Sequence, residues 1–441
     1  MFQRKLMVVM CAVALLVLSA GVSEASLSRV EGMGLGSVPY LSQFTDDYVN
    51  IYPYPTSVVR QNNLVLAELG ANPTGDVNEV EFNDQSLTLI KNFPSFGALA
   101  FDMKQTSLHT TFPGNLTHSQ WDVIWGKGFQ KMDLAVRVDV TNSSFEHTDN
   151  TGGVVTHFEA HGSGFAPNDP YPFGLFFAQN AITSTGIELN TFGVTPAIAL
   201  HMSNDNRIEA AVTLRRYSLD RNASVGGVAG ESWQDNGNLS YSVNIRGIMN
   251  QGDRSTWYPA FWYVNDDLGY EVSGLGAGVE NREVDETYKN VGLGISHNMR
   301  VNDNNLLIFG VAGWMQKASF DRNDQNDGVA NGQVRSAESK TTMAPLFFAS
   351  LETEATSWLK IHMGATQAMM TTKDEETAFD ADSFTDKEKT SDFNFNLGAG
   401  IKWNNLDFDL TLNEAFPLSG GYILSGDQET PATRASATYH F

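Results

Sequence analysis

The chain contains almost no cysteine, few basic residues and no long apolar segment beyond its N-terminus. Of its 441 residues only Cys11 is a cysteine, so disulfide-linked secreted scaffolds and cysteine-ligated zinc sites are excluded. No apolar run of about 18 residues follows the N-terminus, which excludes helical membrane spans. Lys and Arg number 28 against 51 acidic residues, a net charge of −23, which argues against nucleic-acid binding because that affinity depends on clustered basic side chains.

The first 25 residues have the pattern of an export signal. Arg4 and Lys5 precede an unbroken apolar stretch, Leu6–Leu18, and Ser23-Glu24-Ala25 offers small residues at a cleavage site. A stretch of 13 residues is too short to span the roughly 30 Å hydrocarbon core of a bilayer. We therefore expect residues 1–25 to be a signal peptide that is cleaved after Ala25.

The rest of the chain alternates between apolar and polar residues with a period of two. In the clearest stretch, Phe393, Phe395, Leu397, Ala399, Ile401 and Trp403 alternate with polar or small residues, and the pattern resumes after the tight turn Asn404-Asn405. A helix would not keep such a pattern on one face, so the segments are predicted to be strands.

Short turns and long loops alternate along the sequence. Seven short turns and eight long loops predict sixteen strands, with both ends of the barrel sequence on the short-turn side. The long loops are expected at 72–84, 105–118, 144–187, 219–239, 266–285, 320–341, 372–391 and 417–431. Bacterial outer-membrane barrels show this asymmetry, with short periplasmic turns and longer extracellular loops. A soluble β-sandwich would also alternate, but many of these segments reach 10 residues or more, longer than typical sandwich strands. The expected fold is an all-β transmembrane antiparallel barrel of 14–16 strands over residues 63–441, in the outer membrane of a Gram-negative cell.

The C-terminus supports this prediction. The chain ends Ala435-Ser436-Ala437-Thr438-Tyr439-His440-Phe441, with apolar residues at every second position. Tyr439 and the terminal Phe441 resemble the C-terminal strand signature that the barrel-assembly machinery recognises during insertion, so that machinery is an expected partner.

Residues 26–62 lack the alternation and are rich in glycine, aromatics and proline. Gly32-Met33-Gly34, Asp46-Asp47 and Asn50-Ile51-Tyr52 resemble the start of the mature chain in the FadL-type transporters of hydrophobic compounds and their PorV-like relatives. The match ends at Tyr52-Pro53, where those families have Asn-Pro-Ala. The resemblance implies a barrel that usually has fourteen strands and an N-terminal segment folded inside it as a hatch. The predicted plug residues are Gly32, Gly34, Asp46, Asp47, Asn50, Tyr52 and Pro53.

A barrel of fourteen to sixteen strands has a lumen that its own side chains cannot fill. Polar and charged residues on the face opposite the apolar one are expected to line this lumen and to set selectivity. We expect a passive channel or transporter for small molecules, with hydrophobic compounds as one class of solute and with outer-membrane lipid and lipopolysaccharide around it. The predicted lumen-lining residues are Asp102, Lys104, Arg137, Asp139, Glu209, Arg215, Arg246, Asp392, Lys402, Asp407 and Asp409.

Two other possibilities follow from the same sequence. A non-transporting barrel could serve as a scaffold or shuttle for exported proteins, as some PorV-like relatives do. A metal could bind His147, Asp149, His157, Glu159 and His161, but His157-Phe158-Glu159-Ala160-His161 lacks the metalloprotease spacing, in which Glu follows the first His directly, so no metal or cofactor is expected. His297-Asn298 suggests part of a hydrolase triad without an identifiable serine, so we expect no enzymatic activity.

Overall fold

The computed structural model describes residues 26–36, 40–70, 84–109, 115–148, 158–159, 176–177, 184–202, 205–225, 228–273, 282–323, 334–378, 383–412 and 432–441. The predicted signal peptide, most of loop 144–187 and the segment 413–431 lie outside these residues. Among the described residues no helix is both long and apolar enough to cross a membrane.

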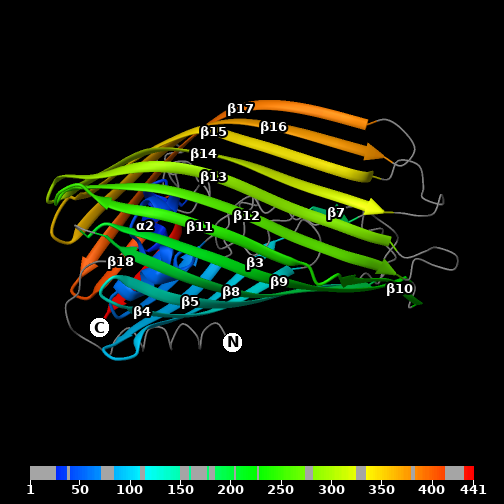
Figure 1. Ribbon diagram of the computed structural model, residues 1–441, viewed down its shortest axis with the longest axis horizontal. Coiled ribbons are helices and arrows are strands. Elements are labelled where there is room, and N and C mark those ends of the chain that lie inside the picture. The colour runs from blue at the N-terminus through cyan, green and yellow to red at the C-terminus, as the bar shows by residue number, and fades with distance from the viewer. Residues whose placement is uncertain are drawn as a thin grey trace, which may run out of the picture.

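The described strands form one closed antiparallel barrel with sixteen positions around its circumference (Figure 1). It closes because the first strand pairs with both the second and the last. β10 and β11 together fill one position, since both pair with β9 and β12. The strands are β1 (Leu64–Gly70), β2 (Asp84–Phe93), β3 (Gly97–His109), β4 (Asn115–Gly128), β5 (Met132–Thr148), β8 (Ser184–His201), β9 (Arg207–Val225), β10 (Val228–Asp235), β11 (Leu239–Asn250), β12 (Ser255–Ser273), β13 (Arg282–Asn302), β14 (Asn305–Asn323), β15 (Val334–Glu354), β16 (Leu359–Ala378), β17 (Ser383–Trp403), β18 (Leu406–Leu412) and β19 (Ala432–His440).

Sixteen strands confirm the count obtained from the turns and loops of the sequence, rather than the fourteen that the family resemblance implied. The short turns also lie where expected: Asn404 adopts a left-handed φ of 56°, which asparagine tolerates, between β17 and β18. A small separate sheet pairs β6 (Phe158–Glu159) with β7 (Phe176–Phe177).

The strands extend further from the short turns than the sequence predicted. Loops were expected at 219–239, 266–285, 320–341 and 372–391, but strands occupy most of these ranges. β13, for example, has 21 residues, roughly 70 Å along its axis at about 3.3 Å per residue. An apolar belt is about 25 Å tall, so the outer part of each long strand lies beyond the lipid and has no reason to be apolar.

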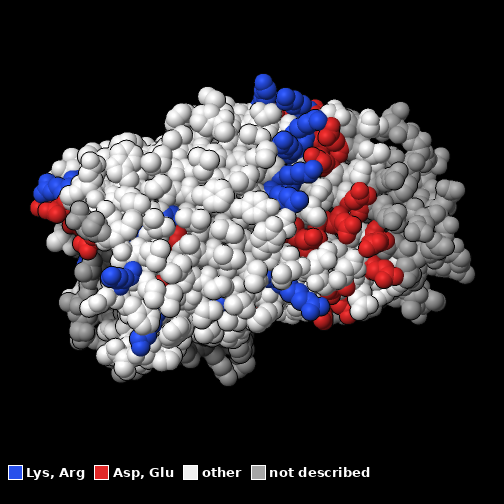
Figure 2. Space-filling view, in the orientation of Figure 1, with Lys and Arg blue, Asp and Glu red and all other residues white. Residues whose placement is uncertain are grey.

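The outer surface carries the apolar belt expected of a membrane barrel. Leu293, Phe393, Phe192 and Met369 are each more than half exposed although they are large and apolar. Figure 2 shows a broad uncharged band, with charged side chains gathered on either side of it. Trp257, Trp358 and Trp403 are exposed near the short turns, the place expected for an aromatic girdle. The protein is therefore an outer-membrane β-barrel.

Candidate functional site

The N-terminal segment lies inside the barrel, at the end where the short turns are (Figure 1). It consists of α2 (Leu27–Gly32) and the 3₁₀ turns η1 (Leu41–Phe44), η2 (Tyr48–Ile51) and η3 (Pro55–Arg60). We call residues 26–62 the hatch segment. α2 packs against β16–β19, η1 against β12, and η3 against β3, β4, β5 and β8, so the segment touches most of the inner wall.

The barrel wall satisfies the backbone carbonyls of the hatch segment. Short 3₁₀ turns leave carbonyl groups without partners, and an unpaired buried carbonyl is costly. The Ser350 hydroxyl donates to the Met33 carbonyl at 2.6 Å, and the Asn298 amide donates to the Phe44 carbonyl at 2.9 Å. The Thr411 hydroxyl donates to the Ser28 carbonyl at 2.8 Å. These bonds hold an irregular backbone in one position.

The buried carboxylate of Glu209 forms ion pairs with three arginines beside the hatch segment. Glu209 accepts from Arg246 at 2.6 Å, from Arg60 at 2.6 Å and from Arg207 at 3.2 Å. Arg246 also donates to the carbonyls of Gln43 and Thr45 in the hatch segment. We call Arg60, Arg207, Glu209, Arg246 and Asp46 the Glu209 cluster.

Asp46 completes the cluster from the hatch side. It lies 2.7 Å from Arg207 and 3.5 Å from Arg60. Burial alone would raise the pKa of Asp46, but the guanidinium groups of Arg60, Arg207 and Arg246 hold it well below its usual range. The Asp46 carboxylate is therefore charged when the hatch segment is docked.

A second group of charges lies under α2. Arg29 contacts Glu352 on β15 and lies 2.7 Å from Asp47. Asp409 accepts from the Ser26 hydroxyl at 2.7 Å. Burial raises the pKa of Asp47 to about 6, although Arg29 opposes this, and the nearby carboxylates Glu352 and Asp409 add to the rise. We call these residues the Arg29 cluster.

A third group lies on the wall itself. Arg137 donates to Asp122 at 2.6 Å, and Arg215 donates to Asp139 at 3.2 Å. Arg137 also contacts the hatch segment, donating to the Tyr52 carbonyl at 3.2 Å with its guanidinium over the Tyr52 ring. The wall therefore binds the far end of the segment as well.

Glycines allow the hatch segment to touch the wall directly. A Cβ on Gly364 of β16 would collide with the carbonyl of Met33. Gly34, the next residue, has a φ of +72° that side chains other than glycine rarely adopt. Gly32 lies against Gly398 of β17. The remaining predicted plug residues are buried: Asn50, which donates to the Thr45 carbonyl, Tyr52, and Pro53 between η2 and η3.

The predicted lumen-lining residues are divided between these groups. Arg137, Asp139, Glu209, Arg215, Arg246 and Asp409 all belong to them. Asp407 lies 3.2 Å from His440 and opposite Lys402 at the short-turn rim. Asp392, on the inward-facing side of β17, joins none of these groups.

Asp102 and Lys104 line a small cavity beside the hatch segment, together with Tyr48, Tyr52 and Arg434. Its volume is about 40 Å³, room for roughly three water molecules. This cavity therefore has no room for a solute much larger than water.

An aromatic and apolar patch covers the inner wall on the extracellular side of the hatch segment. The sequence analysis missed this patch because six of its nine residues lie in the ranges 219–239 and 266–285, which were expected to be loops. Trp233 and Tyr270 stack with ring centroids 5.0 Å apart, and the Tyr270 hydroxyl donates to Glu286 at 2.9 Å. We call the set the inner apolar patch: Leu189, Tyr217, Leu219, Trp233, Leu268, Tyr270, Val272, Val284 and Tyr288, all buried.

The inner apolar patch is continuous with the apolar core around the hatch segment. Val264 on β12 packs against both groups. Two residues closer to the short turns on the same strand, Trp262 stacks on Tyr40 of the hatch segment with centroids 4.9 Å apart. Apolar side chains therefore lie along the inside of β12 from the patch to the hatch, interrupted by the buried carboxylate of Asp266, which accepts from the Tyr217 hydroxyl at 3.2 Å.

The remaining candidates from the sequence are the insertion signal, His297 and the metal ligands of loop 144–187. Tyr439 and Phe441, the predicted insertion signal, stack with centroids 6.5 Å apart at the barrel seam. His297 does have a serine neighbour, since its Nε2 lies 2.5 Å from the Ser255 hydroxyl, but it stacks on Trp257 in the aromatic girdle. Among the described residues no group of His, Cys, Asp and Glu could hold a metal, and the five predicted ligands of loop 144–187 lie outside the described side chains.

No known protein family and no curated protein matches this sequence. Among solved structures, the chain is similar to a Pseudomonas aeruginosa FadL homologue, with 11% identity over 96% of this chain and 100% of that one and a TM-score of 0.48. It is also similar to the ferric yersiniabactin uptake receptor FyuA from Yersinia pestis, with 7% identity, 86% and 72% coverage and a TM-score of 0.37. The assignment as a barrel rests on the strand pairing of this chain.

Proposed function

We propose that this protein is a passive outer-membrane channel for small hydrophobic molecules, closed by the hatch segment. The observation that carries the proposal is the series of apolar side chains inside β12, from the inner apolar patch to Trp262 and Tyr40, which only Asp266 interrupts on that strand. A channel for polar solutes has a polar lumen. The aromatic and aliphatic side chains of the inner wall are buried in this conformation, and a hydrophobic solute that displaced their neighbours would gain a favourable apolar environment there.

The arrangement suggests two stages. A solute first partitions onto the inner apolar patch, where Tyr270 and Glu286 add a polar edge to the apolar surface. It then passes the hatch segment, which is held by hydrogen bonds and ion pairs rather than by covalent links. Movement of this segment opens a path wider than the cavity of about 40 Å³.

The test compares the full mature barrel with a variant lacking residues 26–62, both reconstituted in planar bilayers and in liposomes. We expect the full barrel to conduct few ions and the deletion variant to conduct many, because its lumen is then open. We also expect Trp fluorescence of the full barrel to respond to an apolar solute such as a medium-chain fatty acid, and not to a sugar of similar size.

The proposal fails if neither protein conducts and no apolar solute binds. A barrel that stays closed without its hatch segment, and that crosslinks in cells to a single exported protein, would be a scaffold or shuttle instead.

A further inference from the structure

Five lysines stand side by side on the outer surface of the barrel. Lys289 pairs with Lys317, Lys317 with Lys340, Lys340 with Lys373, and Lys373 with Lys387, so one lysine comes from each of the strands β13–β17. We call these five residues the lysine row. Neighbouring strands lie about 4.8 Å apart, so the row is roughly 19 Å long.

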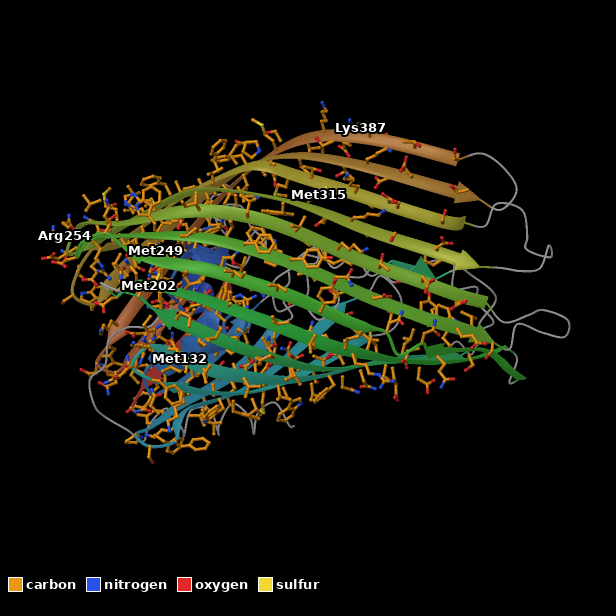
Figure 3. The ribbon with its side chains drawn as sticks, viewed as in Figure 1. Met132, Met202, Met249, Arg254, Met315 and Lys387 are labelled. Atoms are coloured by element: carbon orange, nitrogen blue, oxygen red, sulfur yellow. The ribbon has the colours of Figure 1, made fainter. Side chains whose placement is uncertain are left out.

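The lysine row faces outward, at the extracellular edge of the apolar belt. Met315 lies two residues from Lys317 on the same face of β14 and is 40% exposed, and Leu293 lies four residues from Lys289 and is 66% exposed. Figure 2 shows the basic side chains as a strip between the uncharged band and a zone of acidic side chains. Met315 and Lys387 lie on this part of the surface in Figure 3, far from Arg254 at the short-turn end.

Directly opposed like charges on neighbouring strands are unfavourable. Two of the five are compensated, since Lys317 lies 2.7 Å from Glu338 and Lys373 lies 2.5 Å from Glu375. Within the described part of the chain, Lys289, Lys340 and Lys387 form no ion pair, and all three are exposed. Lys389, two residues from Lys387, adds a further exposed positive charge on the belt side. The strip therefore has an excess of positive charge that an external anion would neutralise.

We propose that the lysine row binds the phosphate groups of a phosphorylated glycolipid in the outer leaflet of the membrane. The short turns face the periplasm in such barrels, so the row lies at the level of the outer-leaflet headgroups. Apolar side chains directly below it would contact the acyl chains of the same molecule. Asp285 and Asp321 face one another on β13 and β14, four residues from Lys289 and Lys317 on the side away from the belt. Their negative charge would repel an anion there, so the anion-binding strip is confined to the edge of the belt.

A row of lysines suits this ligand better than a single small anion. Each ammonium is a compact charge on a flexible stem and so can follow several phosphates along a headgroup without fixed geometry. Lysines near an anionic membrane surface each strengthen attachment about fivefold. The binding is independent of the transport proposed above, because the row lies outside the barrel and the hatch segment inside it.

The test uses the purified, folded barrel in nanodiscs and measures binding of lipid A that carries two phosphates. The variant Lys289→Gln/Lys340→Gln/Lys387→Gln removes only the three lysines without an ion pair. The matched control Lys91→Gln/Lys127→Gln/Lys131→Gln removes the same charge at the short-turn end. We expect the first variant to bind roughly 100-fold more weakly and the control to bind like the wild type.

Heat-modifiable gel migration verifies that each variant is folded. The single variant Lys340→Gln is a second test of lipid binding and should bind lipid A about fivefold more weakly than the wild type. Dephosphorylated lipid A should bind the wild type as weakly as the intact lipid binds the triple variant. Equal binding of both lipids, equal binding by both triple variants, or displacement by millimolar inorganic phosphate would overturn the assignment. Conductance after removal of residues 26–62 should be the same in the triple variant as in the wild type, so failure here leaves the proposed function untouched.

Discussion

Arg246 donates its Nε hydrogen to Glu209 at 2.6 Å, and both side chains are completely buried between the hatch segment and the barrel wall. The same carboxylate also receives Arg60 from the hatch segment and Arg207 from the wall. In the Glu209 cluster the two carboxylates Glu209 and Asp46 thus link the segment to the wall. We expect the stability of the docked segment to depend on the charge balance in this cluster.

We predict that Glu209→Gln destabilises the docked hatch segment by about 3–5 kcal/mol, because three guanidinium groups lose their shared partner. Trypsin should then cleave after Arg60 and ionic conductance should rise. The control Asp303→Asn breaks the exposed pair with Arg254, 2.9 Å apart, and should change stability by less than about 1 kcal/mol. Unchanged trypsin resistance of the Glu209 variant would contradict this prediction.

Gly364→Ala should also loosen the hatch segment, since the new methyl group would occupy the position of the Met33 carbonyl. We expect a cost of about 1–3 kcal/mol, typical of overpacking in a close contact. Faster hydrogen exchange in residues 30–36 would report it. Ala365→Val adds volume on the lipid-facing side of the same strand and serves as the control; an equal response in both variants would exclude the contact as the cause.

The docked hatch segment should become more stable as the pH falls from 7 to 5. In the docked state the pKa of Asp47 is about 6, and in the undocked, solvated segment it returns to its ordinary value near 4. The docked state therefore holds more protons in this window, and docking gains about 1 kcal/mol at pH 5 relative to pH 7.

The charged groups around Asp47 are Arg29, Glu352, Asp409 and Asp46. Asp46 stays ionised over the same window, because its docked pKa is low and its undocked pKa is near 4. Hydrogen exchange of the hatch segment at pH 5 and pH 7 measures the change in docking stability. In Asp47→Asn the gain of about 1 kcal/mol assigned to Asp47 should disappear. A pH response of the same size in that variant would assign it to other groups.

Trp233→Ala should weaken binding of an apolar solute about tenfold, because the stack with Tyr270 forms the largest aromatic surface of the inner apolar patch. Solute titrations monitored by fluorescence of the remaining tryptophans measure the change. Trp358→Ala, in the exposed girdle, is the matched control and should leave the affinity unchanged. Equal affinity in wild type and Trp233→Ala would place the solute elsewhere.

The barrel could be predicted because lipid imposes a strict pattern. Within the belt, residues such as Phe393 and Phe395 must be apolar while their neighbours face inward, so alternation alone locates the strands and their number. Beyond the belt both faces of a strand meet water or polar groups. The ranges 320–341 and 372–391 therefore gave no strand signal, although β14–β17 continue into them.

The site could be predicted only in part for a related reason. Charged residues on the inward face, such as Arg246 and Glu209, were identified from alternation, but their convergence on one point requires the register between strands that are far apart in sequence. The lysine row was missed because its members are isolated in sequence and become neighbours only through strand pairing. The inner apolar patch depends on the same long-range register.

β19 contacts the N-terminal part of the described chain in two ways, by backbone pairing with β1 and by a side-chain ion pair with α2. The backbones pair from Leu64–His440 to Gly70–Arg434, and inside the seam Arg434 lies 2.9 Å from Glu31 of α2. The last strand to be synthesised thus contacts both the first strand and the segment that precedes it. Closure of the barrel and docking of the hatch segment therefore share contacts of β19, and we expect deletion of this strand to weaken both.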